Sequence, residues 1–148
     1  MTPALFYLVS AAENPTPPGA EVAALRTSDG TLVRAACWRS HDTASGTVAL
    51  LPGRSEFIEK YFEVAADLMR RRFAVAALDW RGQGGSQREL TDPRKGHVDD
   101  FSIYRRDLAA LIAHMTALGL PKPWYALAHS MGGAILLDVL ADGETAFA

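Results

Sequence analysis

A serine within a short run of small residues is the sharpest chemical signal in this sequence. Ser130 lies in the segment Ala-His-Ser-Met-Gly-Gly at 128–133, between an apolar run and an apolar helical stretch. A serine on a tight strand-to-helix turn is exposed as a nucleophile, and its neighbours must be small because strand and helix approach closely there. Gly132 supplies one small position, and Ala128 replaces a glycine of the G-x-S-x-G pattern. We predict that Ser130 is a nucleophile; the alternative is a plain glycine-containing helix start.

Two backbone N–H groups are expected to face the oxyanion that such a nucleophile creates. A helix that begins after Ser130 leaves the N–H of Met131 free, and its dipole favours an anion there. A second N–H is expected from the loop after an earlier strand, and Arg54 in the segment Pro-Gly-Arg-Ser-Glu at 52–56 is the candidate. The alternative for that segment is a simple Pro-Gly turn with Ser55 as a helix cap.

A glycine-rich segment, Asp-Trp-Arg-Gly-Gln-Gly-Gly-Ser at 79–86, raises the question of phosphate binding. It lacks the Gly-Lys-Ser/Thr of a P-loop, and its glycine spacing is not that of a dinucleotide-binding turn. Nucleotide binding is therefore a minor alternative.

Apolar periodicity predicts the elements that must position these residues. A hairpin turning at Asp29-Gly30 is expected over 21–39, after an irregular, proline-containing arm at 1–20. Beyond it, buried strands alternate with helices. The expected strands are 47–51, 73–78 and 124–128, and the expected helices 57–72, 101–118 and 132–141. This alternation predicts the α/β class, with a mostly parallel sheet, an N-terminal antiparallel hairpin and flanking helices.

Charged residues refine the expected helix ends. In the helix over 57–72 we expect Glu56 and Glu59 in the first turn, where the helix dipole favours acids, and Phe57 on the buried face. Asp99 or Asp100 is expected to cap the next helix.

Composition excludes several classes of function. The 148 residues are 49% hydrophobic and 22% charged, with a formal net charge of −2, so we expect one globular domain and no partner nucleic acid. The single cysteine, Cys37, excludes an intrachain disulfide and a multi-cysteine metal site. We expect no metal and no cofactor. No apolar run approaches the about 18 residues of a membrane span, so we expect a cytoplasmic protein, with peripheral membrane contact left open.

The motifs together resemble the α/β-hydrolase fold, and more narrowly its monoacylglycerol lipase and bacterial lysophospholipase branch, which is grouped with serine aminopeptidase-like hydrolases. The segments at 52–61, 79–86 and 128–133 match its H-G-x-x-E-h-x-x-R-Y, D-x-x-G-x-G-x-S and G-H-S-M-G-G patterns. Pro52 replaces the usual histidine and Ala128 a glycine.

The resemblance, which spans about residues 21–141, implies hydrolysis of a carboxylic ester such as an acylglycerol or a lysophospholipid. Peptidases and thioesterases use the same machinery, so these activities stay open. Epoxide hydrolases and dehalogenases carry an aspartate at the position of Ser130 and are disfavoured. The resemblance does not set the oligomeric state.

The base that would activate Ser130 is not evident. All four histidines precede the serine, at His41, His97, His114 and His129, whereas this fold places its acid and histidine after the nucleophile. We therefore expect residues 21–148 to be the N-terminal half of an α/β-hydrolase domain, truncated after the helix that follows Ser130. The triad acid and histidine are then expected beyond residue 148.

On this reading the 148-residue chain is inactive alone, and the strand at 124–128 becomes a sheet edge. Among the four histidines, only His97 stays open as a base. The alternative to an enzyme is an inactive truncated or pseudo-hydrolase that serves as a binding module.

Overall fold

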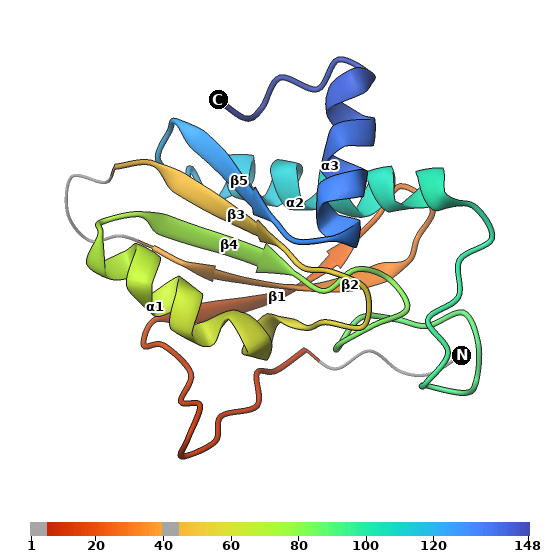
Figure 1. Ribbon diagram of the computed structural model, residues 1–148, viewed down its shortest axis with the longest axis horizontal. Helices are drawn as coiled ribbons and strands as arrows, with labels where there is room; N and C mark the ends of the chain where they lie inside the picture. The colour runs from red at the N-terminus through yellow and green to blue at the C-terminus, as the bar shows by residue number, and fades with distance from the viewer. Residues whose placement is uncertain (1–5, 40–44) are drawn as a thin grey trace.

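The computed structural model describes residues 6–39 and 45–148 and contains a mixed sheet between layers of helix (Figure 1). Its five strands run in the order β1-β2-β4-β3-β5. They are β1 (Ala20–Arg26), β2 (Leu32–Trp38), β3 (Thr47–Leu51), β4 (Ala74–Leu78) and β5 (Trp124–Ala128). The antiparallel β1–β2 hairpin adjoins β4, and β4, β3 and β5 are mutually parallel. The predicted α/β class, the hairpin and the parallel sheet are confirmed.

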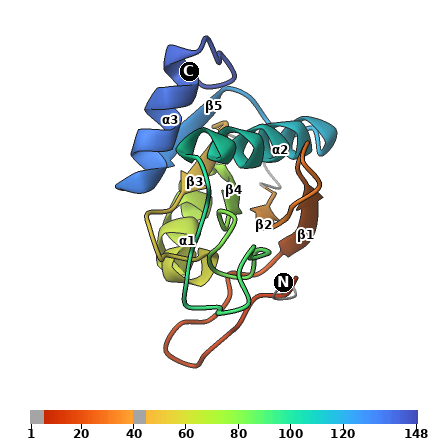
Figure 2. The same ribbon diagram turned by 90° about the vertical axis from the view of Figure 1, so that its right-hand side faces the viewer.

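Helices cover both faces of the sheet, as the turned view shows (Figure 2). On one face α1 (Phe62–Arg70) packs on the sheet through Phe62 and Ala65. On the other face α2 (Tyr104–Ala117) contributes Leu108, Leu111 and Met115 to the larger core, and α3 (Met131–Ala141) adds Ile135. The alternation of side chains along each strand divides the apolar residues between these two cores.

The segment before α1 departs from the predicted helix. A 3-10 turn, η1 (Ile58–Tyr61), precedes α1, and the buried residue is Ile58, whereas Phe57 is 43% exposed. The prediction of Phe57 on the buried face is therefore wrong. The cause is long-range: the backbone N–H of Ile58 donates to the buried carboxylate of Asp79, which fixes the turn.

The second helix behaves largely as predicted. A 3-10 turn, η2 (Phe101–Ile103), leads into α2, and the Asp100 carboxylate accepts the N–H of Ser102 as an N-terminal cap. The chain leaves α2 through Gly119, whose φ of +62° suits glycine. Phe101 is 45% exposed and does not join the buried face.

Strand β5 lies at one edge of the sheet, as expected. Its burial differs from the prediction of a buried strand, because the side chains of Tyr125 and Leu127 are 38% and 49% exposed. They project away from the core occupied by Trp124. No helix in the part of the chain that the structure describes is long and apolar enough to cross a membrane.

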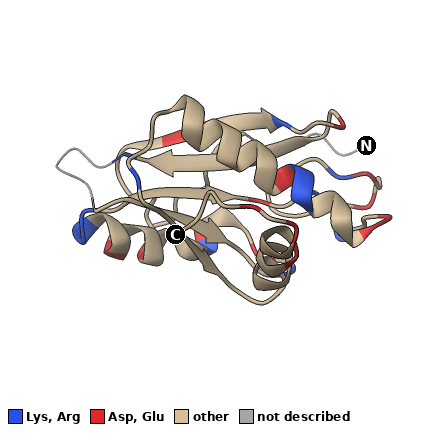
Figure 3. Ribbon diagram, turned by 90° about the horizontal axis from the view of Figure 1, so that it is seen from above, with Lys and Arg blue, Asp and Glu red and all other residues tan. Residues whose placement is uncertain are grey.

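Charged residues lie mainly on helices and loops, while the central strands are nearly free of them (Figure 3). Arg34 in β2 is an exception. It is 3% exposed, and its guanidinium contacts Glu59 of η1 at 2.7 Å and Asp79 at 2.6 Å. Arg34 also donates to the carbonyl of Tyr7, so this buried cluster fastens the N-terminal arm to the sheet.

Candidate active site

Ser130 occupies the turn between β5 and α3. Its φ of +50° and ψ of −115° place a non-glycine residue in a region that glycine adopts readily and other residues rarely. It stands at the N-cap position, yet its side chain makes no capping hydrogen bond. The hydroxyl is therefore not used to hold the helix, and the residue is exposed. Backbone strain of this kind is concentrated at functional sites.

Gly132 permits the close approach that the turn requires. A Cβ at this position would lie 2.3 Å from the carbonyl oxygen of Leu51 and 2.7 Å from that of Pro52. The N–H of His129 donates to the same Leu51 carbonyl at 3.0 Å. The first turn of α3 therefore rests directly on the end of β3.

The oxyanion loop, which we define as residues 52–57 after β3, lies beside the serine turn. The Glu56 carboxylate organises it by accepting the N–H of Gly53 at 2.6 Å and the hydroxyl of Tyr61 at 2.5 Å. Lys60 contacts the other oxygen at 2.7 Å. Hydrogen bonds from Lys60, Tyr61 and the Gly53 backbone lower the pKa of Glu56 to about 2.

These contacts correct the roles expected for the two acids near this helix. Glu56 lies before η1 and caps a loop N–H, which corrects its expected place in the helix. Glu59 does lie in the first turn of η1, but its carboxylate pairs with Arg34. Ser55 is not a helix cap either. The residue before η1 is Phe57, and no side chain caps that turn.

The predicted oxyanion donors, Arg54 and Met131, flank this junction. Arg54 follows Gly53, and Met131 is the first residue of α3. Among the described residues neither backbone N–H has a hydrogen-bond partner. By contrast, the Ser55 N–H donates to the side chain of Gln83, which also donates to the carbonyl of Gly53. The loop is thus fixed by neighbours while the Arg54 N–H stays unused.

The glycine-rich segment at 79–86 is built around a buried carboxylate. Asp79 accepts the N–H of Gly85 at 2.7 Å, and a Cβ on Gly84 would lie 2.2 Å from the Asp79 carboxyl group. The glycine at 84, with φ of +53°, is needed for this enclosure. Its geometry therefore gives no support to a nucleotide-binding turn.

The histidines do not form a base for Ser130 in the described residues. His97 is exposed, with Nε2 2.8 Å from an oxygen of Asp99, and His129 Nδ1 lies 3.1 Å from Glu56. His114 is on α2, where burial lowers its pKa. His41 lies outside the described residues.

Two further features adjoin these histidines. Glu89, His97 and Asp99 bring their ligand atoms within 4.8 Å of one another, but all three are exposed, which does not by itself make a metal site. A cavity of about 390 Å³ lies beside the loop, with Glu56, Tyr61, Leu127 and His129 among its lining.

Sequence reasoning missed the residues that support the site. Glu56, Gln83 and Arg34 hold the loop and its surroundings; Glu56 and Gln83 lie in segments singled out from the sequence, but not for this role, and Arg34 lies in neither. The sequence did carry a signal for Arg34, which is a charged residue inside an otherwise apolar strand. Such a residue is rarely buried without a partner, so an ion pair could have been expected there.

Comparison with known proteins identifies the wider relationship. Residues 42–148 match the protein family described as serine aminopeptidase, S33. Lysophospholipase L2 of Escherichia coli (strain K12) is 50% identical over 91 residues, which are 60% of this chain and 26% of that protein. Monoglyceride lipase of Rattus norvegicus is 30% identical over 120 residues, 81% of this chain and 38% of that protein. The chain thus spans well under half the length of these relatives.

The fold is that of a solved α/β hydrolase. The crystal structure of an α/β hydrolase from Novosphingobium aromaticivorans superposes with a TM-score of 0.69 at 23% identity. The match covers 88% of this chain and 42% of the other.

Proposed function

Because the chain belongs to the serine aminopeptidase S33 family, we propose that Ser130 is the nucleophile of a serine hydrolase that cleaves carboxylic esters. The observation that carries the proposal is the strained turn at Ser130, beside two backbone N–H groups that have no partner among residues 6–39 and 45–148. A serine whose hydroxyl is neither buried nor used as a cap is free to meet a substrate carbonyl.

The chemistry follows from this arrangement. The Oγ of Ser130 attacks the ester carbonyl carbon, and the carbonyl oxygen becomes an oxyanion. The N–H groups of Met131 and Arg54 donate to that oxyanion, the first with the dipole of α3 behind it. Collapse of the intermediate expels the alcohol and leaves an acyl-serine, which water then hydrolyses.

A base must take the proton from Ser130, because a serine hydroxyl is a weak nucleophile at neutral pH. No described histidine contacts Ser130. We place the histidine and its acid beyond residue 148, in the order typical of this fold. On this proposal the 148-residue chain alone has no esterase turnover.

The substrate that we propose is a single-chain acyl ester, either a lysophospholipid or a monoacylglycerol. The support is the pair of relatives, named lysophospholipase L2 and monoglyceride lipase. Peptidase and thioesterase activity use the same groups, and substrate profiling with esters, thioesters and peptides separates them.

The test is labelling by a fluorophosphonate probe, which reacts with an activated serine. We expect the full-length protein to be labelled, and the variant Ser130→Ala to be unlabelled. Labelling that survives Ser130→Ala would refute the assignment. A full-length protein that is never labelled would favour the alternative, a binding module without catalysis.

A second assay addresses the 148-residue chain. We expect it to give no turnover of p-nitrophenyl esters. Turnover that disappears in Ser130→Ala would contradict the placement of the base beyond residue 148.

A further inference from the structure

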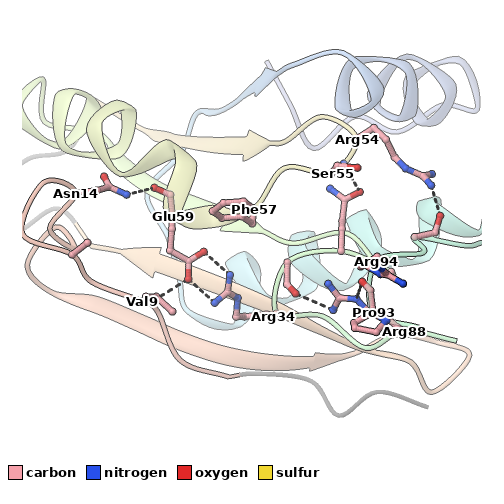
Figure 4. A pocket seen from close by; sticks show the side chains of 16 residues that line it. Val9, Asn14, Arg34, Arg54, Ser55, Phe57, Glu59, Arg88, Pro93 and Arg94 are labelled. Carbon is pink, nitrogen blue, oxygen red and sulfur yellow. Dashed lines mark hydrogen bonds and ion pairs between the residues drawn. The ribbon is translucent and has the colours of Figure 1, made fainter. Parts of the chain in front are cut away.

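A second cavity, of about 610 Å³, opens between the N-terminal arm, the oxyanion loop and the segment after β4 (Figure 4). Four arginines line it, Arg34, Arg54, Arg88 and Arg94, against one carboxylate, Glu59. Neither the predicted nucleophile nor any residue of β5 belongs to its lining. The cavity is therefore distinct from the serine turn, although Arg54 both lines the cavity and belongs to the oxyanion loop.

The charges of this cavity do not cancel. Arg34 is neutralised by Glu59 and Asp79, and Arg94 is paired with Asp92 at 3.2 Å. Arg54 and Arg88 have no carboxylate partner among residues 6–39 and 45–148. Two positive charges therefore remain for an anion to neutralise.

Backbone carbonyls hold these two arginines in place. Arg88 donates from Nε to the Pro93 carbonyl at 2.9 Å, and from one Nη to those of Gly84 at 2.9 Å and Ser86 at 3.0 Å. Its other Nη has no partner among the described residues. Arg54 donates one Nη to the carbonyl of Gly96. Ordered guanidinium groups with unused donors match the geometry of phosphate oxygens.

Apolar residues also line the cavity, beside the Arg34–Glu59 ion pair. Val9 and Ala11 come from the N-terminal arm, and Phe57, which is 43% exposed, comes from the oxyanion loop. An exposed aromatic beside two aliphatic residues favours a ligand with an apolar part.

We propose that this cavity binds the phosphate group of an ester that also carries an apolar chain. Arg54 and Arg88 hold the phosphate, and Val9, Ala11 and Phe57 contact the chain. The proposal stands on the cavity itself and does not depend on catalysis by Ser130.

Calorimetric titration tests the proposal with four probes. These are inorganic phosphate, glycerol 3-phosphate, a short-chain lysophosphatidate below its micelle concentration, and the monoacylglycerol of the same chain. We expect the lysophosphatidate to bind more tightly than either small phosphate. We expect Arg88→Gln to weaken binding of every phosphate-bearing probe about tenfold or more. Binding of the monoacylglycerol should not change.

Arg70→Gln is the matched control, because it removes one positive charge from the exposed end of α1. It should leave all four affinities unchanged. Arg54→Gln, at an exposed residue, gives a second variant in case loss of the Arg88 carbonyl contacts disturbs folding. Circular dichroism checks the fold of each variant.

Three results would overturn the proposal. One is phosphate binding that is equal in the unaltered protein, Arg54→Gln and Arg88→Gln. Another is an equal loss with Arg70→Gln, which would mean non-specific attraction. The third is inorganic phosphate binding as tightly as the lysophosphatidate, which would assign the cavity to free phosphate. None of these depends on Ser130, so fluorophosphonate labelling reports separately on the proposed hydrolase.

Discussion

The imidazole Nδ1 of His129 lies 3.1 Å from Oε2 of Glu56, although the two residues are 73 positions apart in the sequence. His129 adjoins the proposed nucleophile, and Glu56 holds the N–H of Gly53 in the oxyanion loop. This contact joins the two segments whose backbone N–H groups we assign to the oxyanion. Glu56 is therefore a positioning residue for both.

The ionised form of Glu56 should contribute to acid stability. Its pKa falls from 4.5 to about 2 in the folded chain, chiefly through Lys60 and Tyr61. A lowered pKa stabilises the fold above the unfolded value, and this contribution is lost as the pH falls from 4.5 towards 2. We expect Glu56→Gln to be less stable at neutral pH and to lose less stability across that window. Urea unfolding at a series of pH values measures both.

Glu63→Gln is the control for that experiment, because Glu63 is an exposed acid in the first turn of α1. Its stability should follow the pH dependence of the unaltered protein. Identical slopes for Glu56→Gln and Glu63→Gln would contradict the assignment.

The contact of Gly132 with β3 predicts a sharp difference between adjacent glycines. Gly132→Ala places a methyl group 2.3 Å from the Leu51 carbonyl, so we expect a loss of about 1–3 kcal/mol in the free energy of unfolding. Gly133→Ala meets nothing within 4 Å, and the better helix propensity of alanine should leave stability equal or higher. Chemical denaturation compares the two, and equal losses would refute this view of the turn.

The strain at Ser130 should be measurable as stability. Because its side chain caps nothing, Ser130→Ala loses no capping hydrogen bond and keeps the unfavourable φ of +50°. Ser130→Gly relieves that backbone, so we expect it to be more stable than Ser130→Ala by about 1 kcal/mol. Thermal unfolding of the two variants provides the comparison. A glycine variant that is the less stable of the pair would show that the turn is unstrained.

The buried ion pairs of Arg34 should contribute more to the free energy of unfolding than an exposed ion pair of similar length. Arg34→Leu leaves Glu59 and Asp79 without their cation, and we expect a loss of about 3–5 kcal/mol. Arg39→Leu removes an exposed contact with Glu21 and should cost about 1 kcal/mol or less. Urea unfolding measures both. A small effect of Arg34→Leu would mean that water replaces the guanidinium.

The bounds of β3 and β5 and the buried face of α2 were predictable from the local apolar pattern, although two side chains of β5 are exposed. Strands β3 and β5 match the predicted 47–51 and 124–128, and most of the apolar residues spaced along α2 are buried. The turn before α1 was not predictable from the sequence. Its shape depends on Asp79, which lies in a different part of the chain and accepts the N–H of Ile58. The spacing of apolar residues within one segment cannot reveal a hydrogen bond to a distant segment.

The candidate site also has one part that the sequence predicts and one part that it does not. The strained turn at Ser130 follows from the motif and its place between strand and helix, and the structure puts it there. The contact of His129 with Glu56 could not be predicted, since it depends on β5 pairing with β3. Motifs place single residues, whereas strand order decides which of them meet.

The pairing of β5 with β3 sets the order in which the site can be built during synthesis. The oxyanion loop follows β3, but α1, β4 and α2 all intervene before β5. A growing chain on the ribosome therefore carries Gly53 and Glu56 for some time before His129 emerges. Contacts of such long sequence separation also slow folding. The nascent chain is thus without an assembled nucleophile turn until nearly all of these residues have been translated.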